Sequence, residues 1–271
     1  MALVLERGYL LTPSSNHFYK IKLSYKGLNY LGWQRQSSHE NTVQGLLEKS
    51  INIVSKGSLV KSIGSGRTDT GVHALGQAVR LEMKAAFPLN MFLKGVNNEL
   101  PNDIRILEAQ ECDSNFNPVF GAKRKTYKYI LGSLPDRPFL EGLYYYYPKK
   151  IDVGLINRGA SLLVGRHDFC NYFCVGTDVA TTEREIFSCV FRKVNYMDLG
   201  FNQVYGEFYE LEIVGEGFLK QMVRLIVGAL ISLSEGRVTL DDIKRSISTP
   251  LEQKLGSTAP SCGLYLVSVD Y

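Results

Sequence analysis

The sequence has little of what marks several classes of protein. Its 271 residues hold five cysteines, an odd and sparse set that argues against a disulfide scaffold. No apolar run approaches the roughly 20 residues of a membrane-spanning helix. Glu6 and Arg7 interrupt the apolar start of the chain, which argues against a secretory signal. We therefore expect a soluble globular protein of the cytoplasm, with no membrane segment.

The charge balance is mildly basic. Lysine and arginine number 31 against 27 aspartates and glutamates, for a net charge of +4. Hydrophobic residues make up 45% and charged residues 21%, which indicates a sizeable core and excludes a disordered chain. This weak positive charge is compatible with an enzyme that acts on RNA but does not by itself indicate one.

Hydrophobic periodicity predicts both strands and helices along the whole chain. Alternating apolar residues predict strands at 19–25, 127–131, 188–196, 203–214 and 264–269, and two short ones between 60 and 82. Helical spacing predicts helices at 43–54, 87–96, 153–163 and 219–233. Thr42 and Asp152 are expected to cap the first and third helices, and Asn97-Asn98 with Pro101 to end the second.

Strands and helices recur in two halves, which predicts an α+β fold of two similar units around sheets. Residues 1–16 lack a clear period and are predicted to be an N-terminal arm. Two prolines and a glycine make PDRPFLEG (135–142) the best linker candidate, and the linker is predicted to span 135–150. The predicted halves are then 17–134 and 151–271, in keeping with a length of about two domains.

The segment GSGRTDTGVHA (64–74) is the first candidate for chemistry. Its three glycines around Arg67 and Asp69 predict a tight loop with exposed backbone. It is not a P-loop, because Gly71 is not followed by the Lys-Ser/Thr pair, and no strand leads cleanly into a helix as a dinucleotide site requires. Alone, the loop leaves open whether Asp69 caps a turn or reacts.

Arg224 is the second candidate, at the start of a very apolar helix. An arginine there either extends to water or pairs with a buried carboxylate. If Asp69 is its partner, the guanidinium would hold that carboxylate ionised and oriented.

The strand KRKTYKYIL (123–131) is the third candidate, because cations interleave with Tyr127 and Tyr129. Cations for phosphates beside aromatic rings for bases are typical of nucleic-acid binding. An ordinary amphipathic strand with tyrosines inward and lysines outward explains the pattern equally well.

Two further motifs carry weaker signals. The spacing of His167, Cys170 and Cys174, with Cys189 further on, is not a common zinc pattern, so we predict core cysteines and no metal. Trp33 is suited either to stacking on a base or to packing in the core.

Nine segments, taken in order, resemble the TruA family of bacterial tRNA pseudouridine synthases, and the match runs from Tyr19 to Tyr271. The segments are YKGLNYLGWQRQ (25–36), NTVQGLLE (41–48), GRTDTGVHALGQ (66–77), NNELPNDIRI (97–106), KTYKYI (125–130), GRHDFCNY (165–172), TEREI (182–186), FLKQMVRLIVGAL (218–230) and TAPSCGLYLVSVDY (258–271).

The resemblance implies the pseudouridine synthase fold, with two similar α/β-sandwich halves, mixed and mainly antiparallel sheets, and a central catalytic cleft. It also implies a homodimer that isomerises uridines 38, 39 and 40 in the anticodon stem-loop of tRNA, with no metal or cofactor. Asp69 matches the catalytic aspartate and Arg224 its basic partner. Arg67 matches the arginine that helps to flip out the target nucleotide, and Tyr127 the tyrosine that stacks on its uracil.

Contacts to the rest of the RNA are predicted from dispersed cations, namely Lys123, Arg124, Lys125, Lys128 and Arg35. The chain departs from the family here, since Val119 and Lys125 stand where the family usually has arginines. Glu216-Gly217 replace an Asn-Ala pair before Phe218. These departures bear on RNA contacts and not on the reaction.

Two other functions are open to the same sequence. An RNA-binding module that has lost catalysis would be expected to lack Asp69, Tyr127 or Arg224, and all three are present. A glycoside hydrolase usually needs two carboxylates. Asp69 has no carboxylate companion nearby in the sequence, although a distant one could meet it in the fold.

Overall fold

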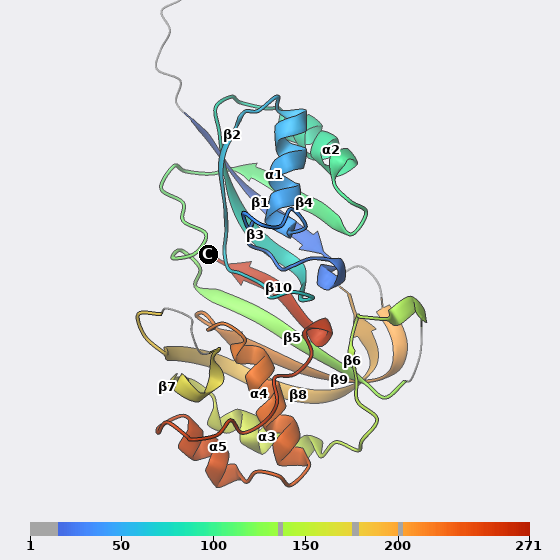
Figure 1. The fold of residues 1–271 in the computed structure, drawn as a ribbon, viewed down its shortest axis with the longest axis vertical. Coiled ribbons are helices and arrows are strands. Elements are labelled where there is room, and N and C mark those ends of the chain that lie inside the picture. Colours follow the sequence, from blue (N-terminus) through green and yellow to red (C-terminus); the bar gives the residue numbers. More distant parts are fainter. Residues whose placement is uncertain (1–15, 135–137, 175–178, 200–202) are drawn as a thin grey trace, which may run out of the picture.

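A computed structural model of the protein describes residues 16–134, 138–174, 179–199 and 203–271, and within these ranges ten strands form one mixed sheet (Figure 1). The strands are β1 (His17–Tyr25), β2 (Leu59–Gly64), β3 (His73–Met83), β4 (Ile104–Glu111), β5 (Arg124–Gly132), β6 (Tyr145–Tyr146), β7 (Gly165–Asp168), β8 (Glu183–Asp198), β9 (Gln203–Gly215) and β10 (Leu264–Asp270). The helices are α1 (Val43–Val54), α2 (Leu89–Glu99), α3 (Val153–Leu162), α4 (Met222–Ser234) and α5 (Leu240–Ser246).

The sheet runs in the order β4-β1-β3-β10-β5-β9-β8-β7, with β2 added beside β3 and β6 beside β5. Its pairings are antiparallel except for β10 with β3 and β5 with β6. Helices α1 and α2 lie against the end of the sheet formed by β1 to β4, and α3, α4 and α5 lie at the end formed by β7, β8 and β9 (Figure 1). The predicted α+β class with a mainly antiparallel sheet is therefore confirmed.

Strand β10 joins the two halves of the sheet. It pairs in parallel with β3, Tyr265 opposite His73, and antiparallel with β5, Leu266 opposite Tyr127. The strand nearest the C-terminus thus separates β3, which follows the Asp69 loop, from β5, which carries Tyr127. It sets the lateral spacing between two of the predicted site residues.

The predicted helix caps are confirmed. The side chain of Thr42 accepts from the backbone N–H of Gly45 at the start of α1, and that of Asp152 accepts from Leu155 at the start of α3. Such caps satisfy backbone donors that the first helical turn leaves without partners.

One predicted helix end is wrong. Helix α2 runs through Asn97 and Asn98 to Glu99 and stops before Pro101. Asn97 is tolerated because its side chain faces β4, where it donates to the carbonyl of Ile106 and accepts from the N–H of the same residue, both at 2.8 Å. This amide pair continues the sheet's hydrogen bonding, so the residue fastens the helix to β4.

Several predicted boundaries fall partly outside the described residues. These are 1–15 of the predicted arm and 135–137 of the predicted linker. The rest of the linker holds β6, and Tyr144 and Tyr147 within it are buried. The division into two halves stays a prediction.

The buried side chain of His73 ties together segments that are distant in the sequence. Its Nδ1 accepts from the N–H of Gly27 at 3.1 Å, so the ring is neutral with its proton on Nε2. Nε2 lies 2.8 Å from the carbonyl of Gly142 and 3.2 Å from that of Cys262, and the ring stacks on Tyr265. Burial lowers the pKa of His73 to about 4, since the charged form would lose its hydration.

Candidate active site

The loop between β2 and β3 is fastened at its start. The N–H of Ser65 donates to the carbonyl of Ala78 at 2.8 Å, and its hydroxyl donates to Oε1 of Gln77 at 2.6 Å. Nε2 of the same buried Gln77 donates to the carbonyl of Gly66 at 2.8 Å. One amide side chain from β3 therefore fixes two consecutive residues of the loop.

The middle of the loop is held from the other side, through Thr68. Its carbonyl accepts from the N–H of Trp33 at 3.1 Å, and its hydroxyl lies 2.8 Å from the hydroxyl of Tyr25. Trp33 itself is only 2% exposed and stacks against Tyr25. The structure thus places Trp33 in the core, beneath the loop, and resolves its open role in favour of packing.

Asp69 and Arg224 meet in an ion pair, as expected if Asp69 is the partner of the helix arginine. Nη1 of Arg224 lies 3.1 Å from Oδ2 of Asp69, and the two side chains are 14% and 23% exposed. Nε of Arg224 donates to the carbonyl of Ala259 at 2.7 Å. The guanidinium is thus oriented by a backbone acceptor on one side while it binds the carboxylate on the other.

The turn that leads into α4 has an unusual backbone. Gln221, the residue before the helix, has φ of 64°, in the left-handed region that favours glycine. This conformation turns the chain sharply between Phe218 and Met222, three residues before Arg224 in the helix. Such strain is common where a site demands a particular geometry.

Tyr127, on β5, lies close to the ion pair and is 8% exposed. Its ring packs edge-on against Phe218, with centroids 5.2 Å apart and an interplanar angle of 82°. Burial, and then the negative charge of Asp69, raise the pKa of the Tyr127 phenol well above its ordinary value. The hydroxyl is therefore neutral at physiological pH and keeps its proton.

Three of the cations predicted to contact RNA are engaged with the protein. Nζ of Lys125 donates to the carbonyl of Ser65 at 2.8 Å. The other two make ion pairs with neighbouring carboxylates, Lys128 with Glu210 at 3.2 Å and Glu212 at 3.9 Å, and Arg35 with Glu48 at 2.8 Å.

The other predicted RNA contacts are exposed. Arg67 lies on the outside of the loop, two residues before Asp69. Lys123 and Arg124 lie at the start of β5, the guanidinium of Arg124 over the ring of Phe187 at 5.5 Å. These three cations are placed where a polyanion can reach them.

Sequence reasoning missed two contributors to the site. Phe218, which supports Tyr127, was visible only as one more apolar residue before the helix. The carbonyl of Ala259, which orients Arg224, carries no sequence signal, because any residue supplies a backbone oxygen.

Within the described ranges, no three histidine, cysteine or acidic side chains come together as metal ligands. The ring of His167 contacts the carbonyl of Val164 at 3.0 Å. Cys189 is buried, and burial raises the pKa of its thiol to about 12, so it is the small core residue that was predicted. Cys170 and Cys174 are only half-buried, so the prediction of a core position is wrong for these two.

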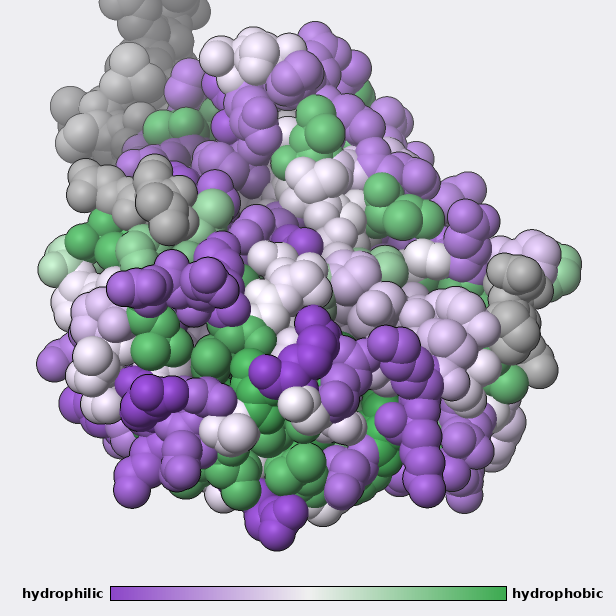
Figure 2. Space-filling view, turned by 60° about the horizontal axis from the view of Figure 1, so that its bottom comes forward, coloured by the Kyte–Doolittle hydropathy of each residue, from purple (hydrophilic) through white to green (hydrophobic). Residues whose placement is uncertain are grey.

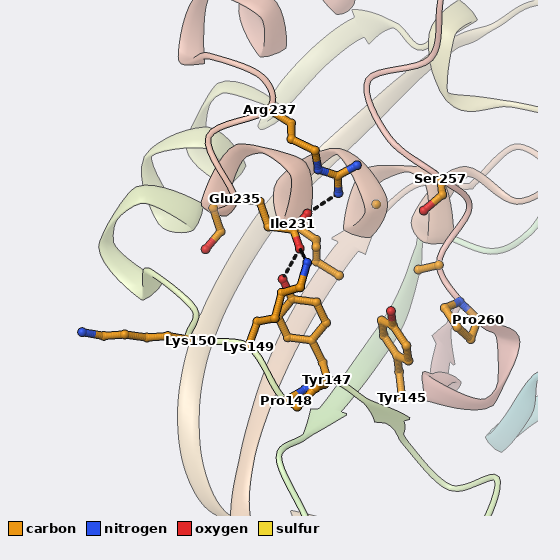
Figure 3. Close-up of a pocket in the computed structure, with 13 residues that line it drawn as sticks. Tyr145, Tyr147, Pro148, Lys149, Lys150, Ile231, Glu235, Arg237, Ser257 and Pro260 are labelled. Carbon is orange, nitrogen blue, oxygen red and sulfur yellow. Dashed lines mark hydrogen bonds and ion pairs between the residues drawn. The ribbon is translucent and has the colours of Figure 1, made fainter.

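A hollow of about 810 Å³ lies beside the site (Figure 3). It is bounded by the segment after β6, the C-terminal part of α4 and residues 257–260. Ala259 lines it, and the carbonyl of that residue also binds Arg224. The hollow therefore adjoins the support of the ion pair.

The charges of this hollow are largely paired with one another. Glu235 accepts from Nζ of Lys149 at 2.6 Å and from the hydroxyl of Tyr147 at 2.9 Å, and it pairs with Arg237 (Figure 3). These contacts, that of Lys149 first, lower the pKa of Glu235 to about 2. Lys150 also lines the hollow, and its side chain extends away from the paired charges (Figure 3). The hollow thus offers little uncompensated charge to an anion.

The described residues on the face of the molecule in Figure 2 form no large hydrophobic patch. On the face shown in Figure 2, hydrophilic residues are spread widely, with smaller hydrophobic areas between them. No helix within the described residues has both the length and the apolar character needed to cross a bilayer.

Comparison with known proteins identifies relatives over most of the chain. A family model described as tRNA pseudouridine synthase matches residues 23–120 and 160–271. The tRNA pseudouridine synthase A of Lacticaseibacillus casei (strain BL23) is 37% identical over 254 residues, which cover 93% of this chain and 99% of the relative. The protein of the same name from Acetivibrio thermocellus is 36% identical over 253 residues, covering 93% and 98%.

Proposed function

Because this chain belongs to the tRNA pseudouridine synthase family, we propose that it isomerises uridine to pseudouridine in tRNA, at positions 38, 39 and 40 of the anticodon stem-loop. The observation that carries this proposal is the ion pair of Asp69 with Arg224 beside Tyr127, since it places one oriented carboxylate next to an aromatic ring. The family name supports tRNA as the substrate.

The reaction breaks the C1′–N1 bond of uridine and joins C1′ to C5 of the same base. The C5 proton is lost to solvent and N1 gains one, so the change is redox-neutral. Asp69 acts in its ionised form, either by adding covalently to the substrate or by removing the proton at C2′. Both routes need a carboxylate that is ionised, correctly aimed and poorly solvated.

Arg224 supplies the aim. It is only 14% exposed, and its Nη1 lies 3.1 Å from Oδ2 of Asp69, so a charged, directional contact orients the carboxylate. Because its Nε is anchored on the carbonyl of Ala259, the guanidinium is already in place before substrate arrives.

The target base must leave its stack to reach Asp69, at a cost of a few kcal/mol. Tyr127, supported by Phe218, stacks on the extruded uracil and recovers about 1–3 kcal/mol. Arg67 is exposed two residues before Asp69 and fills the space that the base leaves in the RNA. Phosphate contacts by cations such as Lys123 and Arg124 then fix the stem-loop by its shape.

The working state that we propose is a homodimer in the cytoplasm that needs no metal or cofactor for the reaction. The resemblance of the motifs to the family supports the dimer. The low cysteine content argues against a disulfide-stabilised secreted protein and so supports the cytoplasm. Light scattering of the purified protein, with and without tRNA, measures the oligomeric state directly.

Asp69→Asn tests the proposed function. The amide keeps the size of the side chain and can still accept from Arg224, but it is neither a nucleophile nor a base. We expect turnover to fall by about 10³-fold or more, as for loss of a reacting group, while tRNA still binds. Pseudouridine is mapped by carbodiimide-dependent reverse-transcription stops, in tRNA from a deletion strain complemented with each variant.

Asp113→Asn is the matched control, because it makes the same change at an exposed carboxylate. Normal modification by the Asp69 variant would contradict the role given to Asp69. The products separate the alternative reaction: a glycoside hydrolase releases free uracil, whereas isomerisation releases no base and leaves the RNA mass unchanged.

A further inference from the structure

Lys125 and Tyr127 are two residues apart on β5, so their side chains leave the same face of the sheet. On the neighbouring strand β10, Val269 is opposite Lys125. Beyond β10 lies β3, roughly 10 Å from β5 at two strand spacings. Strands β2 and β10 both occupy the edge of β3 that faces β5, because β1 pairs along the other edge. A side chain on β5 can therefore contact the loop that follows β2 only past the end of β10.

The lysine makes this contact. Strands β2 and β10 both pair with β3, β2 beside Val79–Met83 and β10 beside His73–Ala74. Ser65 follows directly after β2, and its carbonyl accepts from Nζ of Lys125 at 2.8 Å. This contact links the strand that carries Tyr127 to the loop that carries Asp69.

We propose that Lys125 is a positioning residue, whose ammonium holds the carbonyl of Ser65 and so fixes the loop of Arg67 and Asp69 against the strand of Tyr127. The inference rests on the proposed function, and it assigns Lys125 a task inside the protein in place of the predicted RNA contact.

The surroundings of Lys125 support this task. Burial, and then the nearby charge of Arg184, lower the pKa of the Lys125 ammonium, so the group has left water for a backbone oxygen. An ammonium oriented in this way contributes a strong, directional contact, because the hydrogen bond is assisted by its charge. A solvent-exposed lysine that binds phosphate would have neither the lowered pKa nor the hydrogen bond to a backbone carbonyl.

The loop is fastened to β5 and to β3 by different hydrogen bonds, so the contact with β5 can be removed by itself. Gln77 fastens Ser65 and Gly66 to β3 through two hydrogen bonds of 2.6 and 2.8 Å. Loss of the Lys125 contact leaves those bonds in place, so the loop keeps its fold. The loss of the contact changes only the position of Asp69 relative to Tyr127. It should therefore lower kcat without unfolding the loop.

The test compares Lys125→Met with Lys125→Arg. Methionine keeps the length of the side chain without a donor, and we expect kcat on a tRNA transcript to fall by about 10- to 100-fold, as misplacement of a reacting group by a fraction of an ångström does. The KM for tRNA, the Kd and the dependence of Kd on salt should not change. The guanidinium of Lys125→Arg can donate to the same carbonyl and should restore most of the activity.

Lys61→Met is the matched control, because Lys61 is an exposed lysine of β2. Its kcat should equal that of the unaltered protein. Hydrogen exchange provides a readout that does not depend on activity: in Lys125→Met the amides of 66–70 should exchange faster, and those of α4 should not.

Two results would overturn the proposal. In the first, Lys125→Met keeps kcat but raises Kd and lowers the salt slope by about one, the signature of a lost phosphate contact. In the second, exchange in 66–70 is unchanged in both Lys125 variants. If the unaltered protein forms no pseudouridine, the proposed function fails, and the exchange comparison still decides whether Lys125 holds the loop.

Discussion

Asp69 and Arg224 are 155 residues apart in the sequence, and in the fold their charged groups are joined at 3.1 Å. The carboxylate belongs to the loop between β2 and β3, and the guanidinium belongs to the first turn of α4. The ion pair therefore exists only when this loop and this helix are assembled in one fold.

Two substitutions of Arg224 should distinguish the effect of its positive charge on kcat from the effect of its planar hydrogen-bonding geometry. Arg224→Met leaves Asp69 without its cation, and we expect kcat to fall by about 10²-fold or more, as when a preorganised electrostatic partner is removed. Arg224→Lys keeps the charge but cannot bind Asp69 and the carbonyl of Ala259 with one planar group, so its activity should be intermediate. Single-turnover kinetics measure both variants, and equal loss in the two would show that charge alone is insufficient.

Substitution of Tyr127 distinguishes its ring from its hydroxyl. Tyr127→Phe keeps the edge-on contact with Phe218 and the surface for stacking, so it should retain much more activity than Tyr127→Leu. The difference should be about 1–3 kcal/mol in the free energy of activation, the contribution of one base on an aromatic ring. Measurements of kcat/KM on one tRNA decide the matter. Equal losses would assign the role to the hydroxyl.

The stability of the protein should depend on pH through His73. The pKa of this side chain is about 4 in the folded protein, below its ordinary value of 6.5, so the unfolded chain binds the proton more tightly. The stabilising effect of the neutral ring is complete above pH 6.5 and is lost as the pH falls toward 4. The loss should be about 1.4 kcal/mol per pH unit, or about 3 kcal/mol in all.

His73→Gln isolates this contribution from the carboxylates that also titrate in acid. Glutamine does not titrate, and its amide can donate to one of the two carbonyls that face the ring. The variant should be less stable at pH 7 but should lose less stability between pH 6.5 and 4, as measured by urea unfolding. Parallel pH profiles for the two proteins would contradict the assignment.

Gly27→Ala should destabilise the fold beside the same histidine. A Cβ at Gly27 would lie 1.8 Å from the carbonyl oxygen of Val72, so the backbone would have to shift at a cost in free energy. We expect a loss of about 1–3 kcal/mol or more in the free energy of unfolding. Gly217→Ala is the control, because a Cβ there meets nothing within 4 Å. Comparable losses in the two variants would show that contacts at Gly27 are not the cause.

The sequence predicted what is local. Thr42 and Asp152 cap the helices that they were expected to cap, because capping is decided within four residues. The placement of Arg224 in an apolar helix left open whether its side chain extends to water or pairs with a carboxylate. The resemblance to the family named Asp69 as the partner, and the structure joins the two side chains in an ion pair.

What depends on strand order was not predictable in this way. Lys128 finds Glu210 only because β5 lies beside β9, and Lys125 finds Ser65 only because β10 separates β5 from β3. Hydrophobic periodicity describes one segment at a time and carries no information on its neighbours. Short elements such as β6 and β7 were missed for a related reason, since two to four residues are too few to show a period.

The position of β10 also constrains how the molecule is made. This strand follows every other strand in the sequence, yet it lies between β3 and β5 in the sheet. During translation, the chain through β9 can form two partial sheets, but their facing edges have no partner until residues 264–270 leave the ribosome. Catalytic competence should therefore arise only after β10 has been synthesised, and nascent chains stalled before β10 should be inactive and prone to aggregate.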